Sequence, residues 1–195
     1  MTSGASAARS QFGTVERDGG AHVMRYERRL VHPVEKVWAA LTVPEQLAEW
    51  LAAADELELR HGGRIVLRYQ NVPDDLGDWK REGVEMPEDL DPGAAMSGTI
   101  TRLDPPRLIE YELEQMGLMR WELRPDGDGC LLTFTNVVEL PVEVPPEQTL
   151  AGWHVILDTL AEALAGRPPA WETWTQDHMQ RWKAIRDSYV ERLRG

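Results

Sequence analysis

A run of alternating segments followed by one long helical segment constrains the fold of this chain more than any other feature. Alternation of apolar and polar residues predicts half-buried strands, and short turns between such strands predict an antiparallel sheet. The long segment over 147–165 places apolar residues at helical spacing. Its length of roughly 28 Å is enough to cross a whole sheet. The alternating segments are 22–30, 64–69, 97–103, 108–114, 118–124 and 130–140.

Three further helices are expected on either side of these segments. Pro33 and Pro44 suit the first turn of a helix, so we expect one helix after Pro33 and a short second one over about 45–50. A stretch of glycine and prolines over 166–169 ends the long helix. Residues 171–193 carry apolar side chains at steps of three or four, which predicts a last amphipathic helix.

The chain of 195 residues has the length of one domain with appendages, and we expect that domain over 21–169. Residues 1–20 are rich in Ser, Ala and Gly without periodicity, which predicts a flexible tail. The segment 72–95 holds eight acidic residues, two basic residues and three prolines. It predicts a long surface insertion, either a functional lid or a disordered loop. Residues 170–195 form a helical extension.

The charge of the chain argues against several kinds of partner. With 21 basic and 33 acidic residues the net charge is −12, which disfavours nucleic acid and anionic membrane surfaces. No apolar run reaches the roughly 18 residues that a membrane span needs, and the first residues lack the apolar segment of a signal peptide. The single Cys130 forbids an internal disulfide. We expect a cytoplasmic protein, either a monomer or a homodimer.

Several strings of the sequence resemble the START-like (SRPBCC) superfamily, and within it the family named for homologues of the activator of heat shock protein 90 ATPase. They are HPVEKVWAALTVPEQLAEWL, HGGRIVLRY, GTITRLDPPRLIEYELE, LRPDGDGCLLTF and AGWHVILDTLAEAL, between about Met24 and Gly166. The resemblance implies an α+β helix-grip fold. In this fold a curved antiparallel sheet wraps around the long C-terminal helix, two short helices follow the first strand, and an extra helix ends the chain. The curvature predicts an apolar cavity between sheet and helix.

Three functions stay open, because this superfamily holds lipid carriers, hormone receptors, polyketide cyclases and cochaperones on one scaffold. The leading hypothesis is non-catalytic binding of a hydrophobic or aromatic small molecule in the cavity, without a cofactor. The second is a protein-partner module, in which 72–95 or the last helix contacts a basic surface. A cochaperone-like ATPase activator of the stress response would be such a module. The third is an enzyme of the polyketide cyclase or hydrolase kind.

Aromatic residues are the main candidates for lining the cavity, since eight tryptophans against two phenylalanines is an unusual ratio. Ligand pockets are mostly apolar with a few placed polar groups. The alternative is that these side chains fill the space themselves. The candidates are Trp38, Trp50 and Leu51 from the short helices, Tyr69, Tyr111, Trp121 and Phe134 from the sheet, and Trp153 and Leu157 from the long helix.

Two polar features are candidates for catalysis. His154 and Asp158 lie one helical turn apart, where the carboxylate can orient the ring and raise its basicity for general-base chemistry. The alternative is a weak surface pair on a solvated flank that Glu162 continues. Asn136 alternates with apolar residues, so it points inward and needs a partner from protein, water or ligand. In the enzyme hypothesis, His154 acts with Tyr111 or Asn136 to position a substrate.

Other reactive groups give weaker signals. Arg28 falls on the apolar side of its strand, where a buried guanidinium needs a carboxylate partner. Cys130 begins a predicted strand without an evident activator, which favours a packing thiol. The five histidines are never one helical turn apart, so no metal site is expected, and no phosphate-binding glycine motif implies a nucleotide.

Overall fold

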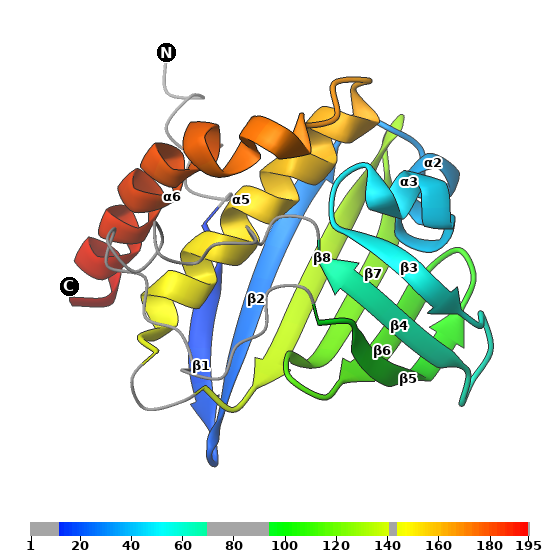
Figure 1. Cartoon of the computed structure of the whole chain (residues 1–195), viewed down its shortest axis with the longest axis horizontal. Coiled ribbons are helices and arrows are strands. Elements are labelled where there is room, and N and C mark those ends of the chain that lie inside the picture. Colours follow the sequence, from blue (N-terminus) through cyan, green and yellow to red (C-terminus); the bar gives the residue numbers. More distant parts are fainter. Residues whose placement is uncertain (1–11, 70–93, 141–143, 195) are drawn as a thin grey trace.

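The computed structural model describes residues 12–69, 94–140 and 144–194, and of 172–177 only the backbone. The described chain forms an antiparallel sheet with helices against one of its faces (Figure 1). The strands are β1 Thr14–Asp18, β2 Ala21–Leu30, β3 Ala52–Leu57, β4 Arg64–Tyr69, β5 Met96–Asp104, β6 Leu108–Leu113, β7 Gly117–Asp126 and β8 Gly129–Val138. The helices are α2 Val34–Thr42, α3 Pro44–Ala48, α5 Pro146–Leu164 and α6 Trp171–Arg194.

The eight strands follow the order β1-β2-β8-β7-β6-β5-β4-β3, and each neighbouring pair is antiparallel. The sheet curves around α5, while α2 and α3 lie at one end of it (Figure 1). This is the α+β helix-grip arrangement that the sequence predicts, with the two short helices after β2 and the extra helix at the end. The predicted fold class is therefore confirmed.

One strand lies inside the segment that the sequence predicts as a flexible tail. Residues 14–18 form β1, which pairs with β2 across a turn where Gly19 has a φ of +60°. The prediction of a tail over 1–20 is wrong for this strand. Its side chains are mostly exposed, so an edge strand of this kind carries no alternation of apolar residues that a sequence pattern could reveal.

The alternation of the other strands separates a buried face from a polar one. On β2 the core face presents Met24, Tyr26, Arg28 and Leu30, whereas the intervening residues 25, 27 and 29 are exposed. On the outer face of the sheet charged groups are paired, as where Arg120 and Thr101 both donate hydrogen bonds to the Glu110 carboxylate. The concave face is thus the one that receives the helices.

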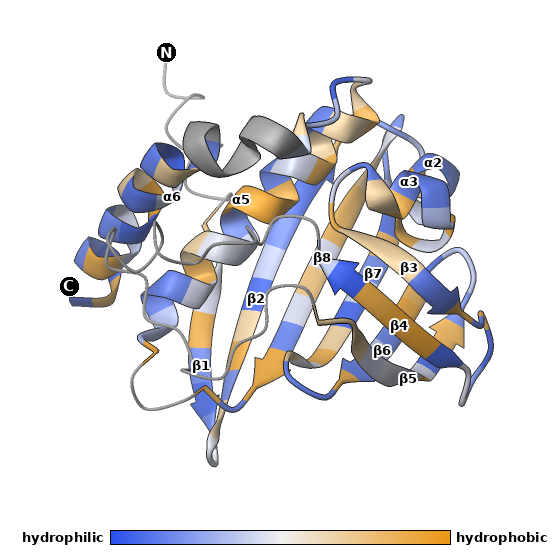
Figure 2. Cartoon of the chain, viewed as in Figure 1, coloured by the Kyte–Doolittle hydropathy of each residue, from blue (hydrophilic) through white to orange (hydrophobic). Residues whose placement is uncertain are grey.

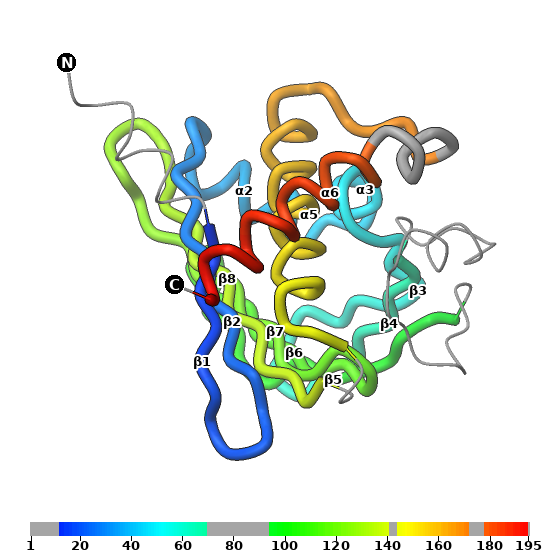
Figure 3. The backbone as a smooth tube through the Cα atoms, turned by 90° about the vertical axis from the view of Figure 1, so that its left-hand side faces the viewer, coloured from blue at the N-terminus to red at the C-terminus, as the bar shows by residue number. Residues whose placement is uncertain are grey.

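Helix α5 lies along this concave face, and α6 covers its other side. The chain leaves α5 through Gly166, whose φ of +75° suits a helix C-terminus. The two views in Figures 1 and 3 place α6 along α5 on the side of β1, away from β3 and β4. Figure 2 shows apolar residues in the central turns of α5 and a mixture of apolar and hydrophilic residues along α6. Because α6 is docked, its partly buried Trp182 and Ile185 pack against the core.

The predicted acidic insertion over 72–95 lies outside the described residues except for its last two positions. Among the described helices, none is both long enough and apolar enough to cross a membrane.

Candidate functional site

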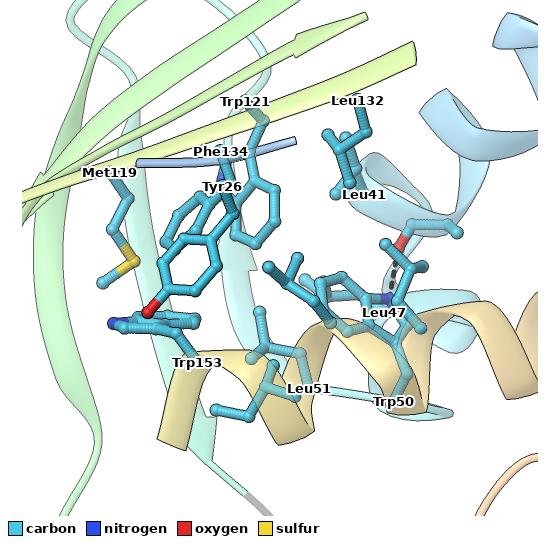
Figure 4. Packing of buried hydrophobic residues seen from close by; sticks show 14 of the residues in the cluster. Tyr26, Leu41, Leu47, Trp50, Leu51, Met119, Trp121, Leu132, Phe134 and Trp153 are labelled. Carbon is cyan, nitrogen blue, oxygen red and sulfur yellow. Dashed lines mark hydrogen bonds between the residues drawn. The ribbon is translucent and has the colours of Figure 1, made fainter. Parts of the chain in front are cut away.

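Six aromatic side chains gather between the concave face of the sheet and α5. We call Trp50, Tyr69, Tyr111, Trp121, Phe134 and Trp153 the aromatic cluster. The ring of Trp121 stacks on that of Phe134 with 4.0 Å between centroids, and Phe134 lies 4.5 Å from Trp153. Trp50 meets Trp121 edge to face at 5.7 Å. Figure 4 shows Trp121 and Phe134 pointing from the sheet toward α5, where Trp153 lies.

The register of the strands explains this gathering. Phe134 is paired with Tyr26 on one side and with Trp121 on the other, so three aromatic rings form one row across the concave face. Met119 and Tyr111 are paired in the next row. Helix α5 approaches β1 and β2 more closely than the strands beyond them, and the large side chains span the wider distance to β7. The core therefore contains large rings because the curved sheet leaves a gap that small residues would not fill.

Every indole N–H of the cluster donates a hydrogen bond within the protein. Trp50 Nε1 donates to Ala40 O at 2.9 Å, and Trp121 Nε1 donates to the hydroxyl of Tyr111 at 3.1 Å. Trp153 Nε1 donates to Asn136 Oδ1 at 3.1 Å. These bonds fix the orientation of the rings, because a buried N–H without an acceptor costs free energy.

The two phenol groups of the aromatic cluster are less completely hydrogen-bonded than its indole groups. Among the described residues, the hydroxyl of Tyr69 donates only to the sulfur of Met119, at 3.7 Å. Burial raises the pKa of both Tyr69 and Tyr111 well above the usual range, so both hydroxyls stay neutral. Neutral phenols at this depth are hydrogen-bond donors rather than bases.

Asn136 points inward, 1% exposed, and the protein itself supplies its partners. Its Nδ2 donates to Met116 O at 2.8 Å and to Leu118 O at 3.2 Å, while its Oδ1 accepts from Trp153. Asn136 therefore ties α5 to β7 and β8. With both ends of its amide engaged, Asn136 holds Trp153 in place and is not available to activate a substrate.

The predicted cavity-lining residues lie together, with one exception. Leu51 and Leu157 are buried in the same core as the aromatic cluster. Trp38 is only partly buried and packs against the edge of this core. Sequence reasoning missed Tyr26 and Met119 as lining residues, although each lies on the apolar face of its predicted strand. Their inward direction was readable from the pattern, but their neighbours depend on the strand register.

A small pocket opens next to the aromatic cluster, at the C-terminal end of α5. Its volume is about 140 Å³, and its lining includes Lys36 from α2, Glu49 and Trp50 from the end of α3, and Leu164 from α5. Lys36 Nζ donates to Leu164 O at 2.8 Å. The pocket is smaller than the roughly 300–1,000 Å³ of typical ligand sites. Trp50 borders this pocket and also contacts Trp121, so its ring links the pocket to the aromatic cluster.

His154 lies on the opposite side of α5 from Trp153 and faces α6. It is 5% exposed, with its Nδ1 3.1 Å from the hydroxyl of Tyr189 and its Nε2 3.9 Å from Asp158 Oδ2. Asp158 also accepts a hydrogen bond from Arg181 of α6. The interpretation of His154 and Asp158 as a surface pair on a solvated flank is wrong, because α6 covers them.

The electrostatics of this second region do not suit a general base. Burial, together with the charges of Arg28 and Arg181, lowers the pKa of His154 to about 3, whereas the general-base hypothesis needs a raised basicity. Burial raises the pKa of Asp158, and Arg181 and Arg28 oppose that shift. The ring of His154 is therefore neutral at neutral pH and enclosed by Tyr189 and Phe12.

The structure does not bring the predicted catalytic residues into one site. Asn136 and Tyr111 lie on the sheet and face α5 from one side. His154 and Asp158 lie on α5 itself and face α6. Arg28 lies on the core face of β2, 5.7 Å above the ring of Tyr26. Cys130 is buried in the core, and burial raises the pKa of its thiol. Within the described ranges no three His, Cys, Asp or Glu side chains gather as metal ligands would.

Comparisons with known proteins agree with this geometry. The model of the family described as activator of Hsp90 ATPase homolog 1-like protein matches residues 31–165. No curated protein matches the chain. Among solved structures, a conserved protein of unknown function, EF2215 from Enterococcus faecalis, superposes with a TM-score of 0.65 at 16% identity, covering 95% of this chain and 92% of that one.

Two further solved structures are similar in fold to this chain. CalU16 from Micromonospora echinospora has a TM-score of 0.54 and 23% identity, covering 89% of this chain and 95% of its own. DynU16 is described as a protein in the dynemicin biosynthetic locus. It has a TM-score of 0.52 and 21% identity, covering 75% of this chain and 48% of its own. At these identities the matches show the fold alone.

Proposed function

Since the chain belongs to the family of activator of Hsp90 ATPase homolog 1-like proteins, we propose that it binds an apolar, aromatic small molecule at the aromatic cluster. The fold of this family, which is also that of polyketide cyclases, generally serves ligand binding. The observation that carries the proposal is the contiguous cluster of aromatic rings in the gap between the curved sheet and α5. A planar ligand in this gap would stack on rings that already prefer such partners.

Burial of apolar surface would contribute favourably to the free energy of binding such a ligand. Burying about 300 Å² of apolar ligand surface corresponds to about 7 kcal/mol before the costs of association. Micromolar affinity requires about 8 kcal/mol after those costs, so stacking on the aromatic rings has to add to this burial. An apolar ligand also avoids the repulsion that the net charge of −12 would exert on an anion.

Entry requires that the cluster rearranges, because its members are buried in the free protein. In this proposal Trp50 is the entrance residue, since its ring borders the pocket at the end of α5 and contacts Trp121 on the other side. Met119 supports the rearrangement, because an unbranched thioether adapts to neighbours of different shape.

Fluorene, a planar apolar probe, tests the proposal with two substitutions. We expect fluorene to raise the Tm of the wild-type protein and to change its tryptophan emission. Phe134→Leu keeps an apolar side chain but removes the ring stacked on Trp121, so it should weaken binding by roughly two- to tenfold.

The matched control is Trp182→Leu on α6, where the ring packs against Arg186 outside the aromatic cluster. It should leave the affinity for fluorene unchanged. Equal losses in both variants, or no binding of fluorene by the wild type, would contradict the proposal.

The two alternatives stay predictions. The partner-binding hypothesis depends in part on 72–95, most of which lies outside the described residues, and its link to the stress response stays a prediction with it. Binding is favoured over catalysis by the separation of His154 from Asn136 and Tyr111 on two sides of α5. A cytoplasmic location also stays a prediction.

A further inference from the structure

On the basis of the proposed function, we infer that the ligand carries a neutral oxygen acceptor, such as a ketone or quinone carbonyl, which the hydroxyl groups of Tyr111 and Tyr69 recognise. The inference deepens the proposed site by naming the class of ligand. It depends on two hydroxyl groups whose hydrogen bonds are incomplete inside an apolar core.

Within the described part of the chain, the hydroxyl of Tyr111 is used only as an acceptor. Trp121 Nε1 donates to its oxygen at 3.1 Å. Among the described residues no group accepts the hydrogen of this hydroxyl, although the side chain is only 4% exposed. A phenol O–H without a protein acceptor is costly at this depth.

The hydroxyl of Tyr69 has a weak partner. It donates to Met119 Sδ at 3.7 Å, and a thioether sulfur is a poor acceptor compared with an oxygen. Tyr69 is also buried, and its hydroxyl makes no hydrogen bond to an oxygen or nitrogen of any described residue. A ligand oxygen would therefore be preferred to the sulfur.

The two hydroxyl groups lie around the same side chain. Met119 receives the bond from Tyr69, and it is the direct cross-strand partner of Tyr111. Displacement of the flexible Met119 side chain would place one ligand atom within reach of both donors. The two hydroxyl groups therefore form a pair of hydrogen-bond donors within the aromatic cluster.

The chemistry of the two donors selects a neutral acceptor. Both hydroxyl groups stay protonated, because burial raises their pKa. Tyr69 and Tyr111 lie among apolar side chains of the core, and the buried guanidinium of Arg28 lies over Tyr26 instead. A carboxylate would have to be buried without a counter-charge, which is far more costly than burying a carbonyl.

Fluorenone and fluorene form a matched pair of probes for this inference. They share one planar skeleton, and only fluorenone carries a carbonyl oxygen. The wild-type protein should bind fluorenone more tightly than fluorene by roughly two- to tenfold, the value of one or two neutral hydrogen bonds. Tyr69→Phe and Tyr111→Phe should each reduce this preference while leaving the affinity for fluorene within about twofold.

Tyr26→Phe provides the control, because the hydroxyl of Tyr26 already donates to Leu150 O at 2.8 Å. It removes a buried phenol group from the same core, and the preference for fluorenone should persist. Tyr69→Phe is the cleaner of the two test variants, since it leaves only a sulfur without a donor, whereas Tyr111→Phe also deprives the Trp121 indole of its acceptor.

The outcomes distinguish the inferred carbonyl recognition from the proposed binding at the aromatic cluster. A preference for fluorenone that is lost in Tyr69→Phe and kept in Tyr26→Phe supports the inference. Equal affinity of the wild type for both probes overturns it and leaves the proposed aromatic site standing. Binding of neither probe overturns the inference and the proposed function together.

Discussion

At the scale of single residues, the side chains on the two sides of α5 behave differently although they are neighbours in sequence. Trp153 turns toward the sheet and donates to Asn136, while His154 turns toward α6 and meets Tyr189. Successive helical residues are separated by about 100°, which is enough to send them into different environments. One residue belongs to the proposed ligand site and the next to the contact that holds α6.

His154 gives the protein a predictable dependence of stability on pH. Its pKa is lowered from 6.5 to about 3 in the folded state, so the unfolded chain binds its proton first. Stability is therefore full above about pH 6.5 and is lost as the pH falls toward 3, at up to about 1 kcal/mol per pH unit. The groups that face the ring are Arg28 from β2, Asp158 from α5, and Arg181 and Tyr189 from α6.

The measurement is the free energy of unfolding in urea for the wild type and for His154→Gln between pH 7 and pH 5. Contributions from other titrating groups are shared by both proteins, so the difference between them isolates His154. We expect the wild type to lose stability relative to the variant as the pH falls. A difference that stays constant over this range would show that the ring is not buried as described.

At the scale of elements, α6 packs against residues 12 and 13, which precede β1. The hydroxyl of Tyr189 accepts a hydrogen bond from Gly13 N at 2.8 Å. The ring of Phe12 packs edge-on against His154 and Tyr189 at about 5 Å, and Arg192 lies 4.0 Å above it. The contact therefore joins the two ends of the described chain across α5.

Gly13 is the most sensitive position in this contact. A Cβ atom at this position would lie 2.4 Å from the ring of Tyr26, which is too close for any real contact. Gly13→Ala should therefore destabilise the protein by about 1–3 kcal/mol in urea unfolding. The matched control is Gly152→Ala in α5, where nothing lies within 4 Å of the added atom.

The control should be neutral or stabilising by about 0.5–1 kcal/mol, because alanine is the better helix former. If Gly13→Ala were as stable as Gly152→Ala, the contact between Phe12, Gly13 and α6 would not exist in solution.

The elements also show what a sequence can and cannot reveal. Strands β2, β4 and β6 to β8 are readable because one face of each is buried, and α5 is readable from its apolar stripe. Strand β1 is not, since it is held by main-chain pairing at an edge. Residues 154 and 158 have the spacing of a surface pair, and only the docking of α6, which is distant in sequence, buries them.

The same limit applies to the candidate site. Alternation and helical spacing identify which aromatic residues point inward, and the structure places eight of the nine expected lining residues in the buried core. The contacts among them depend on strand register, which pairs Trp121 with Phe134 and Met119 with Tyr111. Whether such rings fill a cavity or line it depends on side-chain orientations, which periodicity does not contain.

At the scale of the whole molecule, α5 separates two regions of the interior. The side that faces the sheet carries the aromatic cluster, and the other side carries the polar contacts that hold α6 and the segment before β1. Changes to the α6 contact should therefore alter stability without altering the choice of ligand. Substitutions in the aromatic cluster that preserve side-chain volume should alter the choice of ligand without altering stability.

The central claim is that the aromatic cluster receives the ligand, and the indole N–H signals of the eight tryptophans test it most directly. In ¹H–¹⁵N spectra of the protein with ¹⁵N-labelled tryptophan, each signal can be assigned from single Trp→Phe variants. On titration with fluorenone we predict that the signals of Trp50, Trp121 and Trp153 move together in a saturable way, while that of Trp182 on α6 stays in place. Movement of Trp182 with the three core signals unchanged would contradict the claim.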